Sequence, residues 1–250
     1  MLFDVLQASY DGQSQLMANL TTSQAFFMVI IVGIAGMIVQ WRLRSVVSKY
    51  SEVPLPMGLT GAQIARQMLE AHGIYNVAIT HTSGYLTDHF NPLNKTVNLS
   101  DDVYNGRSIT AAAIACHECG HAIQHARGYA PLRMRSALVP LVQFSSQAAT
   151  WLIIIGLIMT ASSGSQTLCW VGVGLMCVSA LFSIITLPVE YNASERALAW
   201  LESSRILVGE DLEGAKISLR WAARTYLVAA LSAIASILYY VALLNGRRRD

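Results

Sequence analysis

The most informative property of this sequence is how little charge it carries. Charged residues make up 13% of the 250 residues, whereas hydrophobic residues make up 54% and the mean hydropathy is +0.44. A soluble globular domain carries roughly 25% charged residues. The shortage of charge excludes an ordinary soluble domain. It favours a membrane protein, because the uncharged residues are concentrated in a few long apolar runs. The net charge of +2 is too small to indicate a nucleic-acid partner, and we expect none.

Cysteines and N-terminal basic residues are also scarce. The four cysteines are Cys116, Cys119, Cys169 and Cys177, and their spacing indicates neither a secreted disulfide framework nor a four-thiolate zinc site. We expect all four to be packing residues. Residues 1–24 contain no Lys or Arg, which excludes a typical signal peptide with its positively charged start. The first apolar run is therefore expected to be retained as a membrane anchor.

Four apolar runs have the length and composition of membrane spans. We expect transmembrane helices at residues 25–41, 138–161, 168–189 and 226–244. The first run ends at Trp41 and Arg42, an aromatic and basic border typical of a membrane boundary. The fold class predicted from this pattern is a mostly α-helical, multi-pass protein of the cell membrane.

Two polar regions, residues 42–135 and 190–224, lie between these runs and contain most of the basic residues. Basic residues favour the cytoplasmic side, so we expect both regions in the cytoplasm and residues 1–24 outside. The cluster Arg247–Arg249 opposes this topology, since four spans would place it outside. We expect residues 42–135 to form a cytoplasmic catalytic domain and residues 190–224 a cytoplasmic helical segment.

The first polar region is predicted to be a small α+β domain with a sheet of two or three strands. The expected strands are residues 76–80 and 95–100, and residues 88–92 are expected to form a loop. Two helices are expected to begin after the caps Thr60 and Ser108 and to stop at Gly73 and Gly128.

The clearest chemical motif is His117-Glu118-Cys119-Gly120-His121, an H-E-x-x-H pattern in the second of these helices. Residues four apart lie on one helix face, so both imidazoles can bind one Zn²⁺ ion. Glu118 then lies beside the metal and can take a proton from water, whose pKa zinc lowers to about 7. A helix with two packed histidines and a buried glutamate is the alternative, but burying these groups without a cation costs free energy.

A catalytic zinc ion normally has three protein ligands and one open position. His125 lies one turn beyond His121, but a ligand role would require an unusual helix, so a supporting or packing role is favoured. Glu190 is the better candidate, because it follows the third apolar run and the expected topology returns it to the side of the H-E-x-x-H helix. On a helix it shares a face with the small residues Ala193 and Ser194, which allow close packing. The alternative is a solvated carboxylate at the membrane edge.

Five stretches carry a resemblance to a known family. They are GLTGAQIARQMLEAHG, GYLTDHFNP, TVNLSDDVY, AAAIACHECGHAIQH and LPVEYNASERAL. The chain resembles the YugP-type neutral zinc metallopeptidases of bacteria and, more remotely, the HtpX-type and CAAX prenyl-protein peptidases. The resemblance implies a gluzincin-type site in which Glu190 is the third zinc ligand. Those remote relatives have Asp where this chain has Ser194, which changes how a ligating histidine is oriented.

Further polar residues are candidates for supporting a ligand or binding substrate. They are His125, Asn192, Ser194, Arg196, Tyr226, Asp88 and His89. Asp88 and His89 are expected to border the cleft beside a strand that pairs with extended substrate, although a capping Asp is the alternative. Arg196 and Tyr226 are candidates for stabilising an oxyanion. The alternatives are that Arg196 forms a salt bridge and that Tyr226 lies at the membrane interface.

The function predicted from these features is a membrane-embedded zinc endopeptidase. Its expected partners are the lipid bilayer and protein or peptide substrates at the cytoplasmic membrane surface, and a homo-oligomer or a regulatory membrane partner stays open. The first alternative is a non-catalytic zinc-binding membrane scaffold or chaperone-like module, which would not need Glu118. The second is a metal transporter, against which the clustering of charges outside the apolar runs argues.

Overall fold

The computed structural model describes residues 20–246, which divide into two compact units. The helical unit comprises residues 20–36, 139–183 and 228–246, and the site unit comprises residues 37–138 and 184–227. Most of the expected N-terminal segment 1–24 and the cluster Arg247–Arg249 lie outside the described residues.

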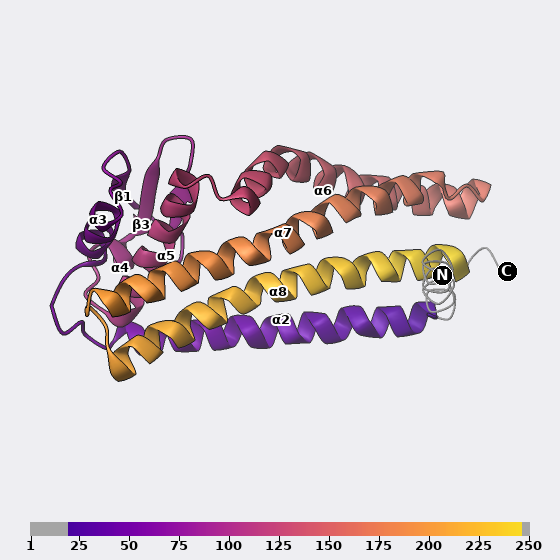
Figure 1. Cartoon of the computed structure of the whole chain (residues 1–250). Coiled ribbons are helices and arrows are strands. Elements are labelled where there is room, and N and C mark those ends of the chain that lie inside the picture. The colour runs from indigo at the N-terminus through magenta and orange to yellow at the C-terminus, as the bar shows by residue number, and fades with distance from the viewer. Residues whose placement is uncertain (1–19, 247–250) are drawn as a thin grey trace, which may run out of the picture. The chain divides into compact units, whose positions relative to one another are not determined.

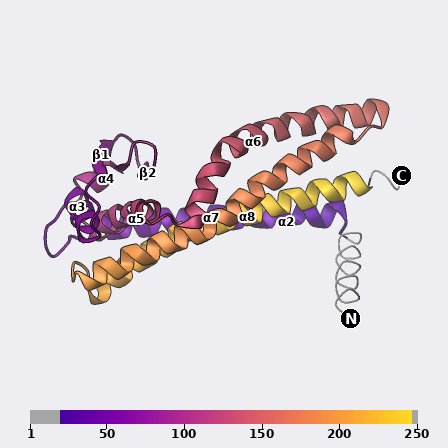
Figure 2. The same ribbon diagram turned by 45° about the horizontal axis from the view of Figure 1, so that its top comes forward.

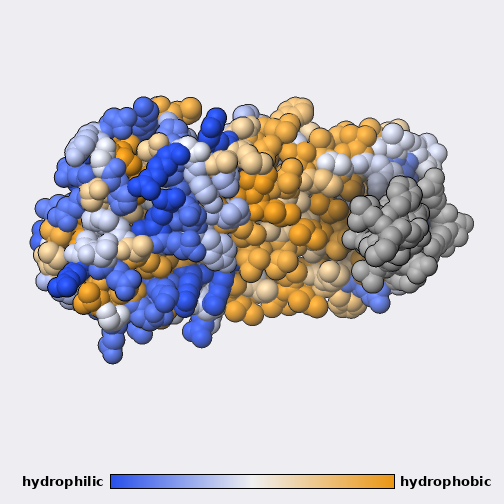
Figure 3. All heavy atoms as spheres, viewed as in Figure 1, coloured by the Kyte–Doolittle hydropathy of each residue, from blue (hydrophilic) through white to orange (hydrophobic). Residues whose placement is uncertain are grey.

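Four long helices form the helical unit and continue into the site unit. They are α2 (Thr22–Ser51), α6 (Ala130–Ser163), α7 (Thr167–Ser203) and α8 (Gly209–Gly246) (Figure 1). Each is long and apolar enough to cross a membrane, and each contains one of the four apolar runs identified in the sequence. Large apolar side chains are exposed along these runs, and the visible surface there is predominantly orange (Figure 3). This is the surface of a membrane protein, because lipid takes the place of water around it.

The helices extend further than the apolar runs predict. Helix α2 continues ten residues beyond Trp41, and α7 continues through Pro188 to Ser203. A helix satisfies its own backbone hydrogen bonds, so it need not end where the side chains change from apolar to polar. The prediction that all four cysteines pack internally is wrong for Cys177, which is exposed on α7.

The site unit contains three further helices and a three-stranded sheet. Their bounds are α3 (Gly61–Ala71), β1 (Ala78–Thr82), β2 (His89–Asn91), β3 (Thr96–Ser100), α4 (Asp101–Tyr104) and α5 (Ile109–Ala126). The predicted caps are confirmed. Thr60 forms a capping box with Gln63, and the Ser108 hydroxyl accepts a hydrogen bond from the Ala111 amide. Gly73 and Gly128 follow the two helix ends with positive φ of 72° and 63°, which glycine adopts without strain.

The sheet corrects one prediction. The expected loop at 88–92 contains strand β2, which pairs antiparallel with β3, while β1 pairs parallel with β3 on its other side. Only three residues of β2 are paired and Pro92 follows, so local sequence gives little strand signal and the pairing with β3 decides the conformation. Strand β3 is therefore central, and β2 forms the edge that lies against α5 (Figure 2).

Helix α5 packs closely against α7 inside the site unit, and Gly120 makes this contact possible. A Cβ atom at Gly120 would lie 2.6 Å from the Ala193 carbonyl oxygen and 3.0 Å from the Ala193 Cα atom. Both atoms belong to the backbone, so neither can move without displacing α7. Ala193, Ala197 and Leu201 are fully buried along the same part of α7. This close contact between α5 and α7 fixes the position of the neighbouring turn of α7 relative to the H-E-x-x-H residues.

We expect Gly120→Ala to destabilise the protein. Alanine favours a helix by about 1 kcal/mol over glycine, but overpacking against a backbone costs about 1–3 kcal/mol, so the clash prevails. The measurement is thermal unfolding of the purified protein in detergent. Gly174→Ala is the matched control, because nothing lies within 4 Å of a Cβ atom there. Equal stability of the two variants would contradict the close contact.

Candidate metal centre

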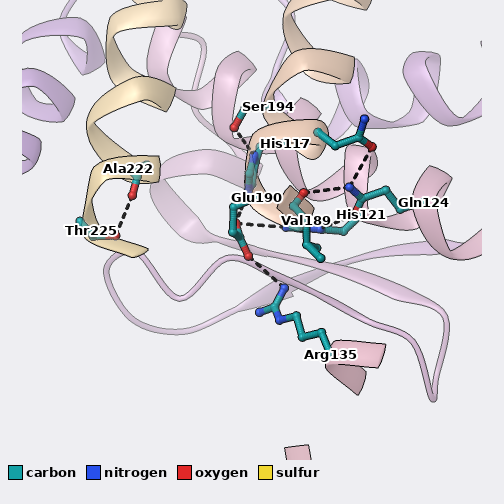
Figure 4. A network of polar contacts seen from close by, with 10 residues as sticks. His117, His121, Gln124, Arg135, Val189, Glu190, Ser194, Ala222 and Thr225 are labelled. Atoms are coloured by element: carbon teal, nitrogen blue, oxygen red, sulfur yellow. Dashed lines mark hydrogen bonds and ion pairs between the residues drawn. The ribbon is translucent and has the colours of Figure 1, made fainter. Parts of the chain in front are cut away.

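Two elements far apart in the sequence bring three potential ligands together. His117 and His121 lie one turn apart on α5, and Glu190 reaches them from α7 (Figure 4). The Glu190 Oε2 atom lies 3.2 Å from His117 Nε2 and 3.5 Å from His121 Nε2. One ligand atom from each of the three residues lies within 4.8 Å of the others, so the group could hold a metal ion.

The chemistry and spacing of these atoms fit zinc. Ligand atoms at about 2.0–2.1 Å from a tetrahedral zinc ion lie roughly 3.3 Å from one another, close to the two distances from Glu190. Two imidazoles and one carboxylate form a donor set typical of catalytic zinc, which leaves a fourth position open. Glu190 is only 1% exposed and His121 is 7% exposed. A cation compensates the cost of burying a carboxylate between two imidazoles.

Each imidazole is oriented through its other nitrogen. His117 Nδ1 lies 3.1 Å from Ser194 Oγ, and His121 Nδ1 lies 3.0 Å from Gln124 Oε1. With Nδ1–H donating to these oxygens, both Nε2 lone pairs are free to bind a metal. Ser194, one of the residues expected to support a ligand, therefore contacts His117, and its role stays a prediction.

Gln124 is itself held by α7. Its amide nitrogen donates to the Val189 carbonyl oxygen at 2.8 Å and to Asn192 Oδ1 at 3.1 Å. Arg196 Nε donates to the same Asn192 oxygen at 2.8 Å. Asn192 and Arg196 therefore act on His121 through Gln124, and sequence reasoning did not identify Gln124.

Arg135 is the second residue that sequence reasoning missed. It lies near the start of α6, and its Nη1 atom donates to Glu190 Oε1 at 2.9 Å. The two oxygens of Glu190 therefore face different partners, one the guanidinium and the other the imidazoles. An arginine just before an apolar run is typical of a membrane border, so nothing in the sequence indicated that Arg135 contacts Glu190.

Glu118 lies beside the three residues in an enclosed position. It is 8% exposed, and burial raises its pKa to about 7. His117 and the Phe90 backbone of β2 lower this pKa, whereas the carboxylates of Glu190 and Asp88 raise it. A carboxylate whose pKa lies near neutrality can both accept and return a proton.

A cavity of about 180 Å³ opens onto this group, and we call it the metal-side cavity. His117, Glu118 and Glu190 line it together with Asp88 and Tyr226. Asp88 accepts hydrogen bonds from the Ser100 amide and hydroxyl, and burial raises its pKa. The remaining wall comprises Leu43, Val47, Leu86, Ile114, Ser194, Ser218, Leu219, Ala222, Ala223 and Thr225.

Three other candidate residues lie away from this cavity. The His125 ring packs against Phe90, with centroids 5.6 Å apart, and His89 Nδ1 contacts the Thr87 carbonyl. Arg196 holds Asn192 and is absent from the cavity wall, so the geometry does not place it at an oxyanion. Tyr226, the other oxyanion candidate, does line the cavity.

Comparison with known proteins agrees with this geometry. Residues 25–245 match the model of a family described as "Putative neutral zinc metallopeptidase", and the chain belongs to this family. It is similar to the "Putative membrane protease YugP" of Bacillus subtilis (strain 168), with 40% identity over 209 residues. That alignment covers 83% of this chain and 91% of the relative. No solved structure matches the chain significantly.

We expect Arg135→Leu to weaken zinc binding about 10- to 100-fold, because Glu190 loses the contact that orients it. Zinc affinity is measured by competition with a chromogenic chelator on the purified protein. Arg133→Leu is the control, since Arg133 lies exposed two residues earlier on the same helix. Tighter binding by Arg135→Leu would mean that the guanidinium competes with the metal.

Proposed function

We propose that this protein is a zinc-dependent endopeptidase that hydrolyses peptide bonds of membrane-associated proteins. The observation that carries the proposal is the convergence of His117, His121 and Glu190 beside Glu118, at a cavity of about 180 Å³. The family match and the similarity to a membrane protease support the same reading.

In the proposed reaction, His117, His121 and Glu190 hold the metal, and Glu118 moves protons. A zinc ion in this position would polarise the scissile carbonyl and make water more acidic. Glu118 takes a proton from the attacking water and later delivers it to the leaving amine. Tyr226 lies in the same wall as Glu190 and is positioned to donate to the developing oxyanion.

The walls of the metal-side cavity support a substrate at the membrane. Leu43 follows the Trp41–Arg42 border on α2, and on α8 Thr225 precedes the last apolar run, which Tyr226 begins. The cavity is thus built where two membrane-spanning sequences end. We place it on the cytoplasmic side, because the polar regions that form it contain most of the basic residues.

Glu118 also separates this proposal from a non-catalytic zinc scaffold. A scaffold requires only the three ligands, and a buried carboxylate that does not bind the metal would add a desolvation cost without benefit. The position of Glu118 in the cavity wall favours a group that acts on a bound molecule.

We expect Glu118→Gln to retain zinc and to lose peptidase activity by about 10²- to 10⁴-fold, the usual contribution of a general base. Activity is measured as casein cleavage, and zinc content by elemental analysis of the same sample. Glu195→Gln, at an exposed position of α7, is the control and should keep full activity. Unchanged cleavage by Glu118→Gln would exclude the mechanism.

Metal removal gives an independent prediction. Ortho-phenanthroline should abolish casein cleavage, because three protein ligands leave the metal open to a chelator. Its meta isomer, which cannot chelate, serves as the control. Stoichiometric zinc added after dialysis should restore the rate of casein cleavage. Cleavage that persists in metal-free protein would contradict the proposal.

A further inference from the structure

A second and larger cavity borders the metal-side cavity. It measures about 430 Å³, and we call it the outer cavity. Val47, Leu86 and Ile114 line both cavities, so the two lie side by side, and we treat them together as one groove. None of the residues that only the outer cavity contains belongs to the candidate metal centre.

Two helices give this groove its direction. On α2, Leu43 and Val47 line the metal-side cavity, and Val47 and Ser51 line the outer cavity. These positions are spaced by four residues, so they form one face of the helix. From Leu43 to Ser51 the helix rises about 12 Å. The groove therefore leads away from the membrane border at Trp41.

Helix α5 lines the two cavities in the reverse order. Thr110, Ala111 and Ile114 line the outer cavity, and Ile114, His117 and Glu118 line the metal-side cavity. An extended chain advances about 3.3 Å per residue, so a groove of about 12 Å accommodates roughly four residues. The dimensions suit a polypeptide that passes the metal centre.

The chemistry of the wall changes along the groove. Beside the polar residues of the metal centre, Asp88 and Tyr226, the metal-side cavity has an apolar wall formed by Leu43, Val47, Leu86, Ile114, Leu219, Ala222 and Ala223. The outer cavity adds three exposed charged side chains, Glu52, Asp102 and Arg107. Within residues 20–246 none of these three forms an ion pair. Two carboxylates against one guanidinium leave an excess of negative charge.

We propose that the groove binds the border of a membrane protein, with apolar residues beside the metal centre and basic residues in the outer cavity. This inference rests on the proposed peptidase function and names its substrate class. Cytoplasmic flanks of membrane spans are rich in Lys and Arg, and an apolar stretch followed by basic residues matches the order of the wall. Arg107 offsets part of the negative charge of the outer cavity, so we expect a moderate preference for basic residues and not an absolute one.

The test uses the full-length protein in an uncharged detergent, with zinc and Glu118→Gln to prevent cleavage. The probes are two fluorescein-labelled peptides with the same Ala-Leu-Ala-Leu-Ala half, followed by three lysines or by three glutamates. We expect the lysine peptide to bind about three- to tenfold more tightly by anisotropy, the effect of a few exposed ion pairs. Raising the salt should reduce this ratio.

Variants locate the preference in the outer cavity. Glu52→Lys with Asp102→Asn should abolish or reverse the ratio, whereas the control pair Glu70→Lys with Glu195→Gln should preserve it, because both control residues are exposed outside the groove. Ser51→Trp should weaken both peptides by filling the groove. Ser48→Trp, exposed one turn earlier on α2 and absent from both walls, should not.

The inference is overturned if neither peptide binds, if both bind equally, or if the ratio is unchanged by Glu52→Lys with Asp102→Asn. Casein cleavage by the wild-type protein is scored separately. Binding with the lysine preference but without any cleavage would refute the peptidase and retain the groove. Casein cleavage without a preference for the lysine peptide would support the peptidase and refute the proposed role of the groove.

Discussion

The site depends on one contact, the approach of the Glu190 carboxylate to two imidazoles. Glu190 lies on α7 and the imidazoles on α5, so the contact exists only if these helices touch. Gly120 and Ala193 allow the backbones to approach within the distance that a Cβ atom would prevent. Gln124 then joins α5 to the same part of α7 through Val189 and Asn192. The packing of small residues and the polar network hold the donor atoms at one spacing.

The contact between Glu190 and the two imidazoles also determines how the buried carboxylate is paired. A buried carboxylate is costly unless it is paired, and removing one partner of a buried pair costs about 3–5 kcal/mol. Glu190 has the imidazoles on one oxygen and Arg135 on the other. Within residues 20–246 Glu118 forms no ion pair, and burial raises its pKa to about 7 although His117 acts against the shift. The two neighbouring carboxylates therefore differ in pKa because their surroundings differ.

Much of this arrangement could be predicted from the sequence, and the limits have physical causes. The H-E-x-x-H spacing, the caps at Thr60 and Ser108 and the apolar runs are local patterns, so a single sequence reveals them. Strand β2 and the contact between Arg135 and Glu190 depend on partners brought together by the fold, and local propensity gives no sign of them. Glu190 was predicted from its place after the third apolar run, from the small residues on its helix face and from the family resemblance. The sidedness of the membrane and the roles of individual site residues remain predictions.

The ion pair of Arg135 with Glu190 has a consequence for biogenesis. A third metal ligand that is already neutralised by a residue of its own chain does not carry a bare negative charge while the helices assemble. The polypeptide can therefore complete its insertion and helix packing before any metal is delivered.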